Sequence, residues 1–214
     1  RWPNDQKNKK YMTMKLIKLL LIITVIVPLS ANADMEIVRK SYQKKHFDIT
    51  LIEIKQHLTS NAEAQYLMAK MYEQGDGIVK NPHRAIRWYV KSAESGYNDA
   101  DYALGELFER GDLLSKNYSE ARRWYRKGAE SGHADSQMKL GLMLHEGRGG
   151  KRDSIEGLAW LDVARNSGLK MADTLLQANV KNLTAEQKST LTQRKQQLLT
   201  TLKNKVTAKK GNTQ

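Results

Sequence analysis

The chain has 214 residues, of which 40% are hydrophobic and 28% charged, a composition typical of a folded globular protein and too apolar for wholesale disorder. It contains no cysteine, which excludes disulfide scaffolds, cysteine nucleophiles, iron–sulfur clusters, cysteine-ligated zinc and a lipid-carrying cysteine anchor. The formal net charge of +13 belongs to the two ends, because residues 34–169 carry 21 basic and 20 acidic side chains, so we expect no nucleic-acid partner.

Residues 1–33 have the layout of an upstream extension followed by a secretory signal peptide. Lys15 and Lys18 precede an apolar segment, Leu19–Val27, and Ala31-Asn32-Ala33 has the small-x-small pattern of a cleavage site. The apolar segment is well short of the ~20 residues that a membrane-spanning helix needs. We therefore expect cleavage after Ala33 and a periplasmic or secreted protein with no membrane span once the signal is removed.

Residues 34–61 are expected to be helical and to form a degenerate half-repeat. Within them, Tyr42–Asn61 looks like a degenerate copy of the second helix of the repeat that follows. Ser60 then stands near the position at which that repeat has a glycine.

The central region repeats with a period of 36 residues. The clearest columns are Trp88, Trp124 and Trp160; Gly75, Gly111 and Gly147; and Gly96, Gly132 and Gly168. Small residues recur in the same way at Ala69, Gly105 and Gly141 and at Ala85, Ala121 and Gly157. Columns in register over three units indicate a repeat protein, which we divide into 62–97, 98–133 and 134–169.

Each unit is predicted to be a pair of antiparallel helices. In the second unit, small or apolar residues recur at helical spacing over Asp99–Arg110, and Gly111 stands where a left-handed residue would end the helix. Asn117 or Ser119 then caps a second helix that ends before Gly132. One pair cannot bury its apolar face alone, so pairs must stack, with small residues allowing close approach and tryptophans filling the space between units. We predict an all-α, right-handed α-solenoid.

Three stretches of the first unit carry a family resemblance. They are Ala64–Tyr72 (AQYLMAKMY), Gly75–Ile78 (GDGI) and Ala85–Gly96 (AIRWYVKSAESG). They are similar to the A-x-Y-x-L-G-x-x-Y, G-x-G-V and A-x-x-W-Y-x-x-A-A-x-x-G pattern of the Sel1-like repeat (SLR) family, a relative of the tetratricopeptide repeat. Leu113 departs from this pattern at a glycine position, so the turn of the second unit must differ. The resemblance covers about residues 62–172 and implies a binding surface lined by the first helix of each pair.

Residues 170–203 are predicted to close the stack with capping helices. Met171–Val180 forms a last first-type helix, and Thr184 with Gln187 makes a capping box that opens a further helix over about Ala185–Leu202. Its apolar stripe is expected to dock on the last repeat through Leu191, Leu198, Leu199 and Leu202. Residues 204–214 are expected to be a flexible basic tail, able at most to make weak contact with an anionic surface.

Sequence motifs for catalysis are weak. Ser-x-x-Lys occurs at Ser41, Ser136 and Ser167, close to the number that chance predicts, and the companion motifs of penicillin-binding enzymes are absent. The five histidines follow no metal-ligand spacing. We expect no catalytic residue, metal or cofactor. The alternative is a cell-wall-directed protein that binds or hydrolyses peptidoglycan-like or β-lactam-like substrates.

The resemblance places a candidate partner-binding surface on the outward positions of the first helices. These positions are Tyr66, Lys70, Tyr102, Glu106, Met138 and Leu142. The two tyrosines would form an aromatic pair one repeat apart, and Met138 and Leu142 would continue it as an apolar strip, a composition enriched in interface cores. With similar weight, the tyrosines pack between adjacent first helices instead. We predict a non-catalytic scaffold of the bacterial periplasm that binds an unidentified protein or peptide on the concave face formed by the first helices.

Overall fold

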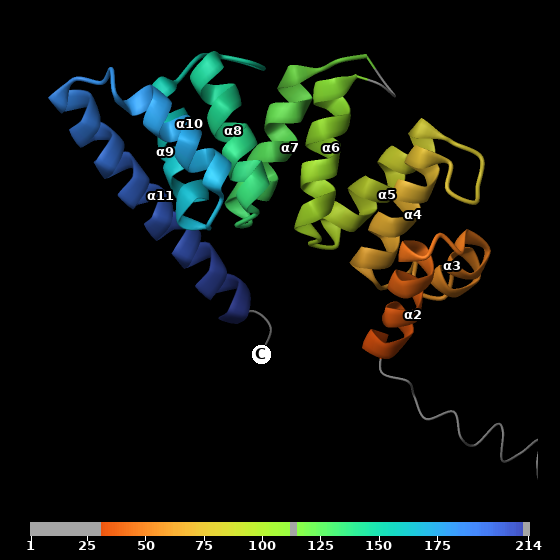
Figure 1. Cartoon of the computed structure of the whole chain (residues 1–214). Coiled ribbons are helices and arrows are strands. Elements are labelled where there is room, and N and C mark those ends of the chain that lie inside the picture. Colours follow the sequence, from red (N-terminus) through yellow and green to blue (C-terminus); the bar gives the residue numbers. More distant parts are fainter. Residues whose placement is uncertain (1–30, 112–114, 212–214) are drawn as a thin grey trace, which may run out of the picture. The chain divides into compact units, whose positions relative to one another are not determined.

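The structure, a computed structural model, describes residues 31–111 and 115–211. These residues form ten helices and no strand, which confirms the all-α prediction (Figure 1). They belong to two compact units divided after Gln56. The predicted leader lies outside the described residues, apart from Ala31-Asn32-Ala33 at the start of the first helix, and so does Leu113. Over the described ranges, no helix combines the length and the apolar character needed to cross a membrane.

The first unit is a short helix pair. Its helices are α2 (Ala31–Gln43) and α3 (Phe47–Ile54). The prediction of one helix over Tyr42–Asn61 is wrong, because the chain reverses after Gln43, where Lys45 adopts a positive φ of 59°. The buried Thr50 hydroxyl donates to the buried Ser41 hydroxyl at 2.9 Å, which ties the two helices together.

The second unit contains three helix pairs in which every helix has 13 residues. The pairs are α4 (Ala62–Gln74) with α5 (Pro82–Glu94), α6 (Asn98–Arg110) with α7 (Tyr118–Glu130), and α8 (Ala134–Glu146) with α9 (Ser154–Asn166). We call α4, α6 and α8 the A helices and α5, α7 and α9 the B helices. Each predicted repeat contains one pair, and each helix packs against the next in the chain (Figure 1).

Local residue choices explain why these helices begin and end where they do. Every A helix ends at a glycine in the left-handed region, with φ between 75° and 84°, which explains the column of Gly75, Gly111 and Gly147. Every B helix begins with a capping side chain that accepts from the backbone N–H three residues later. These caps are Asn81, Asn117 and Asp153, one repeat apart.

Helices A and B of a pair approach so closely that some positions have no room for a side chain. A Cβ built on Gly105 would lie 2.4 Å from the ring of Tyr125, and one built on Gly157 would lie 2.5 Å from the carbonyl oxygen of Gly141. The predicted packing purpose of the small-residue columns is therefore confirmed at these positions. The fully buried Tyr125 ring fills the volume that Gly105 leaves.

The tryptophan column is buried unevenly. Trp124 and Trp160 are 7% and 2% exposed and belong to the two main apolar clusters, as predicted. Trp88 is half-buried and packs against the same cluster as Trp124, so it is less enclosed than the other two. Lys91 lies over its ring, with the ammonium 5.1 Å from the ring centroid.

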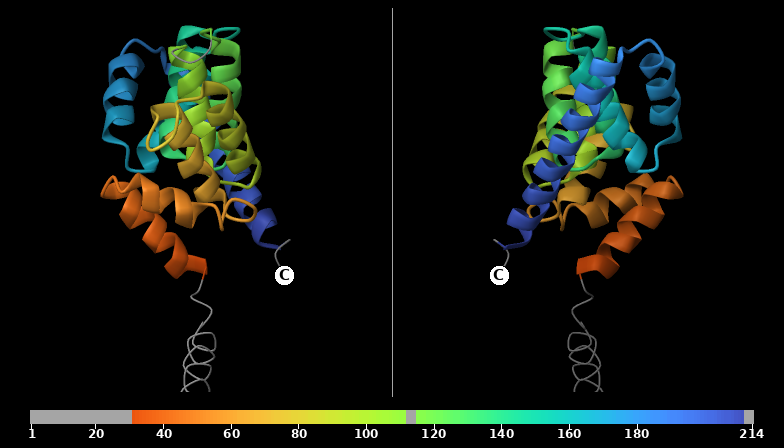
Figure 2. Two further views of the ribbon diagram at one scale, coloured as in Figure 1. Left: turned by 90° about the vertical axis from the view of Figure 1, so that its right-hand side faces the viewer. Right: turned by 90° about the vertical axis from the view of Figure 1, so that its left-hand side faces the viewer.

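Two helices follow the last repeat. They are α10 (Lys170–Val180) and α11 (Ala185–Gly211), and both pack against α9 (Figure 2). The capping box is confirmed, because the Thr184 N–H donates to Gln187 Oε1 and the Gln187 N–H donates to Thr184 Oγ1. The prediction of a flexible tail from residue 204 is wrong as far as Gly211, since α11 continues to that residue and Lys205 pairs with Glu130 at 2.7 Å.

Candidate interaction surface

Two consecutive repeats hold the same aromatic arrangement on their A helices. The Tyr66 ring lies between Tyr89 of its own B helix and Tyr97, the N-cap residue of α6, with centroids 5.5 and 5.1 Å away. The Tyr102 ring lies in the same way between Tyr125 and His133, at 5.7 and 5.2 Å. We call these six rings the tyrosine seam. They explain the half-buried state of Tyr66 and Tyr102, each of which packs against a ring of its own B helix and a ring at the turn that follows.

Carboxylates hold the hydroxyl ends of the seam. Tyr89 donates to Glu73 at 2.6 Å, and Tyr125 donates to Glu109 at 2.8 Å, so this contact also repeats. Tyr102 donates to Glu106, the next turn of its own helix, at 3.1 Å. These hydrogen bonds restrict the rings of Tyr89, Tyr102 and Tyr125.

Burial and nearby acids keep the tyrosines of the seam protonated. Burial, followed by the charges of Asp99, Glu73 and Glu106, raises the pKa of Tyr66 to about 12. Burial and then Glu106 raise the pKa of Tyr102 as well. The seam therefore presents neutral phenols among carboxylates near neutral pH.

Basic side chains from the next repeat neutralise the glutamates behind the seam. Arg110 reaches back to Glu73 at 2.7 Å. Lys139 and Arg148 pair with Glu109 at 3.0 and 2.7 Å. Burial alone would raise the pKa of Glu109, but the hydrogen bonds from Lys139 and Tyr125 and the charge of Arg148 outweigh it and lower that pKa. These ion pairs link consecutive repeats.

The remaining predicted surface residues divide into accessible and inaccessible ones. Lys70 is half-buried, with its ammonium 5.8 Å from the centroid of the Tyr66 ring, and Leu142 is also half-buried. The prediction that Met138 extends an exposed apolar strip is wrong, because its side chain is only 7% exposed and belongs to the cluster that contains Leu161. In the third repeat Leu161 stands where the first two have seam tyrosines, so Met138 packs into a wholly apolar site.

A buried polar column joins the repeats below the seam. Gln137 donates its side-chain amide to the Ala129 carbonyl of the preceding repeat at 3.2 Å, and Gln65 donates to the Leu58 carbonyl, just before the first repeat, at 3.0 Å. Asp101 occupies the same column and is 2% exposed. Its carboxylate cannot donate a hydrogen bond to the preceding repeat, and Lys127 donates that hydrogen bond instead. The Lys127 ammonium lies 3.0 Å from Asp101 Oδ1 and donates to the Ala93 carbonyl at 3.0 Å.

One Ser–His–Asp arrangement invites comparison with a catalytic triad. Ser136 Oγ lies 3.0 Å from His133 Nδ1, and His133 Nε2 lies 3.3 Å from Asp99 Oδ1. His133 is also the N-cap of α8 and accepts the Ser136 backbone N–H. Ser136 is fully buried, with its hydroxyl against Gly128, so a substrate cannot reach it. The contacts cap a helix and orient the His133 ring in the seam.

The other two Ser-x-x-Lys motifs have structural roles as well. The buried Ser41 hydroxyl donates to the Val38 carbonyl at 3.0 Å. Ser167 ends α9 and donates weakly to Gln137 at 3.4 Å. Among the residues that the structure describes, no group of three His, Asp or Glu side chains is arranged to hold a metal ion.

Sequence reasoning missed the Tyr–Glu contacts and the polar column, although both have a periodic signal. Glu73 and Glu109 are 36 residues apart, each 16 residues before a tyrosine that contacts it. Gln65, Asp101 and Gln137 follow the same period. Helix periodicity indicates which residues face inward, but only the arrangement of the repeats shows which columns meet.

The comparisons with known proteins agree with this architecture. The Sel1 repeat model matches residues 62–97, 98–133 and 134–169. Among solved structures, a Sel1 repeat protein from Oxalobacter formigenes is 33% identical, with a TM-score of 0.63, over 68% of this chain and 60% of that chain. The chain thus spans 60% of the length of that protein. No curated protein matches the sequence.

Two further solved structures are similar at lower scores. A protective antigen with an SLR fold, present in uropathogenic Escherichia coli strains, is 25% identical with a TM-score of 0.48, over 78% of this chain and 44% of that chain. Helicobacter pylori cysteine rich protein B is 16% identical with a TM-score of 0.48, over 69% of this chain and 98% of that chain.

Proposed function

Because the chain belongs to the Sel1 repeat family, whose members are helical repeat scaffolds generally used for protein–protein interaction, we propose that it is a non-catalytic scaffold that binds a protein or peptide on its A helices. The tyrosine seam is the observation that carries this proposal. Tyr66 and Tyr102 are both half-buried, aromatic neighbours pack against both rings, and Tyr102 also donates a hydrogen bond to Glu106. Rigid aromatic side chains lose little entropy on binding and are enriched among residues that dominate binding energy.

The acids beside the seam indicate the chemistry of the partner. Glu63, Asp99 and Asp135 form a column in the first turns of the three A helices. We infer a partner segment that combines basic side chains with aromatic or aliphatic ones. Its basic residues would meet the acid column, and its apolar residues would cover the edges of Tyr66 and Tyr102.

A binding experiment tests the surface without removing the structural rings. We would use residues 34–214 as bait in a crosslinking pull-down from envelope extract, beside a Lys70→Ala/Glu106→Ala/Leu142→Ala variant. A matched control, Arg87→Ala/Glu94→Ala/Val79→Ala, removes the same kinds of group from the B helix and turn of the first repeat. Circular dichroism checks that all three baits are folded.

A protein recovered with wild type and with the control, but lost with the A-helix variant, supports the proposal. Equal recovery by all three folded baits contradicts the A-helix surface. Recovery of no protein, together with saturable binding of a wall polymer, favours the cell-wall-directed alternative.

The proposal includes export to the periplasm or beyond. Its support is the pattern of Lys15 and Lys18, the apolar segment Leu19–Val27 and the small-x-small site ending at Ala33. Intact mass of the protein recovered from a periplasmic fraction is expected to begin at Asp34. A mass that still includes the apolar segment, or recovery in the cytoplasm alone, contradicts this part of the proposal.

A further inference from the structure

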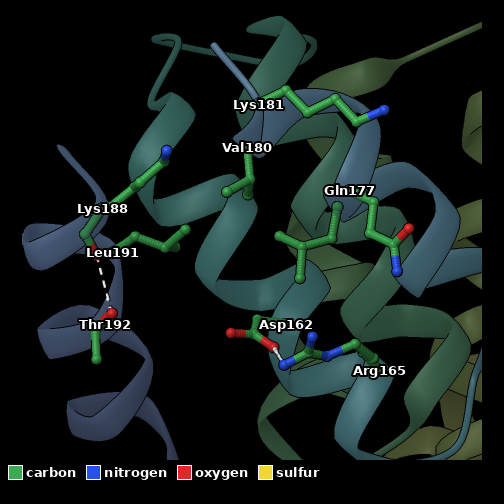
Figure 3. Close-up of a pocket in the computed structure, with 9 residues that line it drawn as sticks. Asp162, Arg165, Gln177, Val180, Lys181, Lys188, Leu191 and Thr192 are labelled. Carbon is green, nitrogen blue, oxygen red and sulfur yellow. Dashed lines mark hydrogen bonds and ion pairs between the residues drawn. The ribbon is translucent and has the colours of Figure 1, made fainter. Parts of the chain in front are cut away.

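The helices that follow the repeats enclose a pocket with an apolar floor. It has a volume of about 490 Å³ and lies between α9, α10 and α11 (Figure 3). Leu176 and Leu191 are 5% and 6% exposed, and Val180 is half-buried beside them. The volume falls in the range of small-molecule sites, and no residue of the tyrosine seam lines it. We call it the C-terminal pocket.

The charge around the C-terminal pocket is positive. Its single acidic lining residue, Asp162, is 13% exposed and already pairs with Arg165 at 2.5 Å and with Lys195 at 3.1 Å. Lys181, just after α10, and Lys188, in the first turns of α11, line the pocket without an acidic partner among the described residues. In Figure 3 the Asp162–Arg165 pair lies at the opposite end of the pocket from Lys181. The pocket thus has a basic end and an apolar floor.

The neutral polar groups in the pocket are already engaged, which restricts what it can bind. The Gln177 amide donates to Asp173 at 2.9 Å, and the Thr192 hydroxyl donates to the Lys188 carbonyl at 2.9 Å. A peptide backbone would bring one donor and one acceptor per residue and find few partners here. An aliphatic chain needs none, and an anionic head would be attracted by the positive charge of Lys181 and Lys188, which line the pocket from different sides (Figure 3).

We propose that the C-terminal pocket binds a small anionic amphiphile, with its aliphatic chain on Leu176, Val180 and Leu191 and its anionic head at Lys181 and Lys188. The lysine stems extend the apolar surface while their ammonium groups stay in water, an arrangement suited to a carboxylate or phosphate at the pocket mouth. This proposal does not depend on the A-helix surface and can succeed or fail independently of it.

The test is calorimetric titration of the protein with dodecanoate below its micelle concentration. We expect saturable binding of one molecule per chain, weakened about tenfold in a Lys181→Gln/Lys188→Gln variant. The matched control, Lys80→Gln/Lys151→Gln, removes the same charge from two exposed lysines outside the pocket and is expected to bind like wild type. Dodecyl phosphate in place of dodecanoate shows which anionic head is preferred.

Dodecanol and dodecyltrimethylammonium test the role of the head group, and both are expected to bind much more weakly than dodecanoate. Absence of saturable dodecanoate binding would overturn the proposal, as would equal affinity in the two lysine variants or equal binding of the cationic amphiphile. An acidic peptide that binds the pocket where dodecanoate does not would also overturn it. Both variants change exposed side chains, so circular dichroism is expected to show the wild-type helix content.

Discussion

We predict that Lys127 stabilises the folded protein chiefly because it neutralises the buried carboxylate of Asp101. Replacing Lys127 with Met keeps an unbranched aliphatic side chain and removes the ammonium, which also lies 5.2 Å from the centroid of the Trp124 ring. The Asp101 carboxylate, 2% exposed, then loses the ammonium 3.0 Å away. Breaking a fully buried ion pair costs about 3–5 kcal/mol. The Lys127 side chain is 44% exposed and therefore partly screened, so we expect a loss of ~2–3 kcal/mol in the free energy of unfolding.

The neighbouring repeats suggest a second substitution that should restore the stability lost in Lys127→Met. Gln65 and Gln137 fill the same column, and each donates its own amide to a backbone carbonyl of the segment before its repeat. In the double variant Asp101→Gln/Lys127→Met, the new amide can donate to the Ala93 carbonyl as Lys127 does in the wild type. Neutral replacements of buried ion pairs are often close to neutral in stability, so we expect the double variant to unfold within about 1 kcal/mol of wild type.

Urea unfolding followed by circular dichroism at 222 nm measures this cycle. Lys91→Met is the matched control, because Lys91 also lies over a tryptophan but has Gln65, not an acid, in the column. We expect it to cost about 1 kcal/mol or less. A loss in Lys127→Met no greater than in this control, or a double variant no more stable than Lys127→Met, would refute the reasoning.

The pH dependence of the same variants gives an independent check. Burial raises the pKa of Asp101, and the ammonium of Lys127 opposes that rise. An acid whose pKa is raised by folding contributes most stability below its unfolded pKa, about 3.9, and this contribution is lost as pH rises through the folded pKa. Removing Lys127 raises the folded pKa further. The difference in stability between wild type and Lys127→Met is therefore expected to shrink as pH falls toward 4.

Three further predictions concern the packing between helices and repeats. Gly105→Ala places a Cβ 2.4 Å from the Tyr125 ring, and we expect a loss of about 1–3 kcal/mol in urea unfolding; an unchanged midpoint would contradict the close packing. Trp124→Ala empties a 7% exposed site in the middle repeat and is expected to cost about 3–5 kcal/mol, measured by thermal unfolding; a loss below 1 kcal/mol would show that the ring is not a core element. The pKa of Glu109 is lowered in the folded protein, so its stabilisation is present above about pH 4.5 and is lost as pH falls through the folded pKa. In Glu109→Gln we expect the free energy of unfolding to depend less on pH below about 4.5. An unchanged slope would contradict the ion pair with Lys139.

The repeat architecture was predictable because its signals are local and recur. Glycines that end A helices and asparagine or aspartate caps of B helices act through their own backbone, so the 36-residue columns indicate them directly. The capping box of Thr184 and Gln187 is a signal of the same kind. The boundaries of the helix pairs followed from these residues.

The accessible surface was less predictable, because the exposure of each A-helix residue depends on which side chains of other helices pack against it. Met138 occupies the column of Tyr66 and Tyr102, yet it is buried where they keep an accessible edge. Helical spacing assigns the same orientation to all three residues. The difference comes from the residue packed against each one, a tyrosine in the first two repeats and Leu161 in the third.

The extent of α11 was underestimated for a related reason. The leucine stripe ends at Leu202, so the stripe alone predicts a tail beyond that residue. These residues include no proline, and no glycine before Gly211, and Lys205 pairs with Glu130 of α7. An apolar stripe indicates where a helix docks, whereas a helix end needs a residue that stops it.

Once the structure shows which repeat positions contact each other, the sequence reveals further pairs of residues that depend on one another. Ser136 stands in a column that is otherwise alanine, at Ala64, Ala100 and Ala172. Gly128 stands in the column that faces it, and a Cβ there would lie 2.5 Å from the Ser136 hydroxyl. The hydroxyl oxygen of Ser136 thus occupies space that a side chain at position 128 would fill. Asp101 and Lys127 form a second pair of this kind, because the acid in the glutamine column is matched by an ammonium 3.0 Å away. In both pairs a departure from the repeat pattern is compensated by the residue that it contacts.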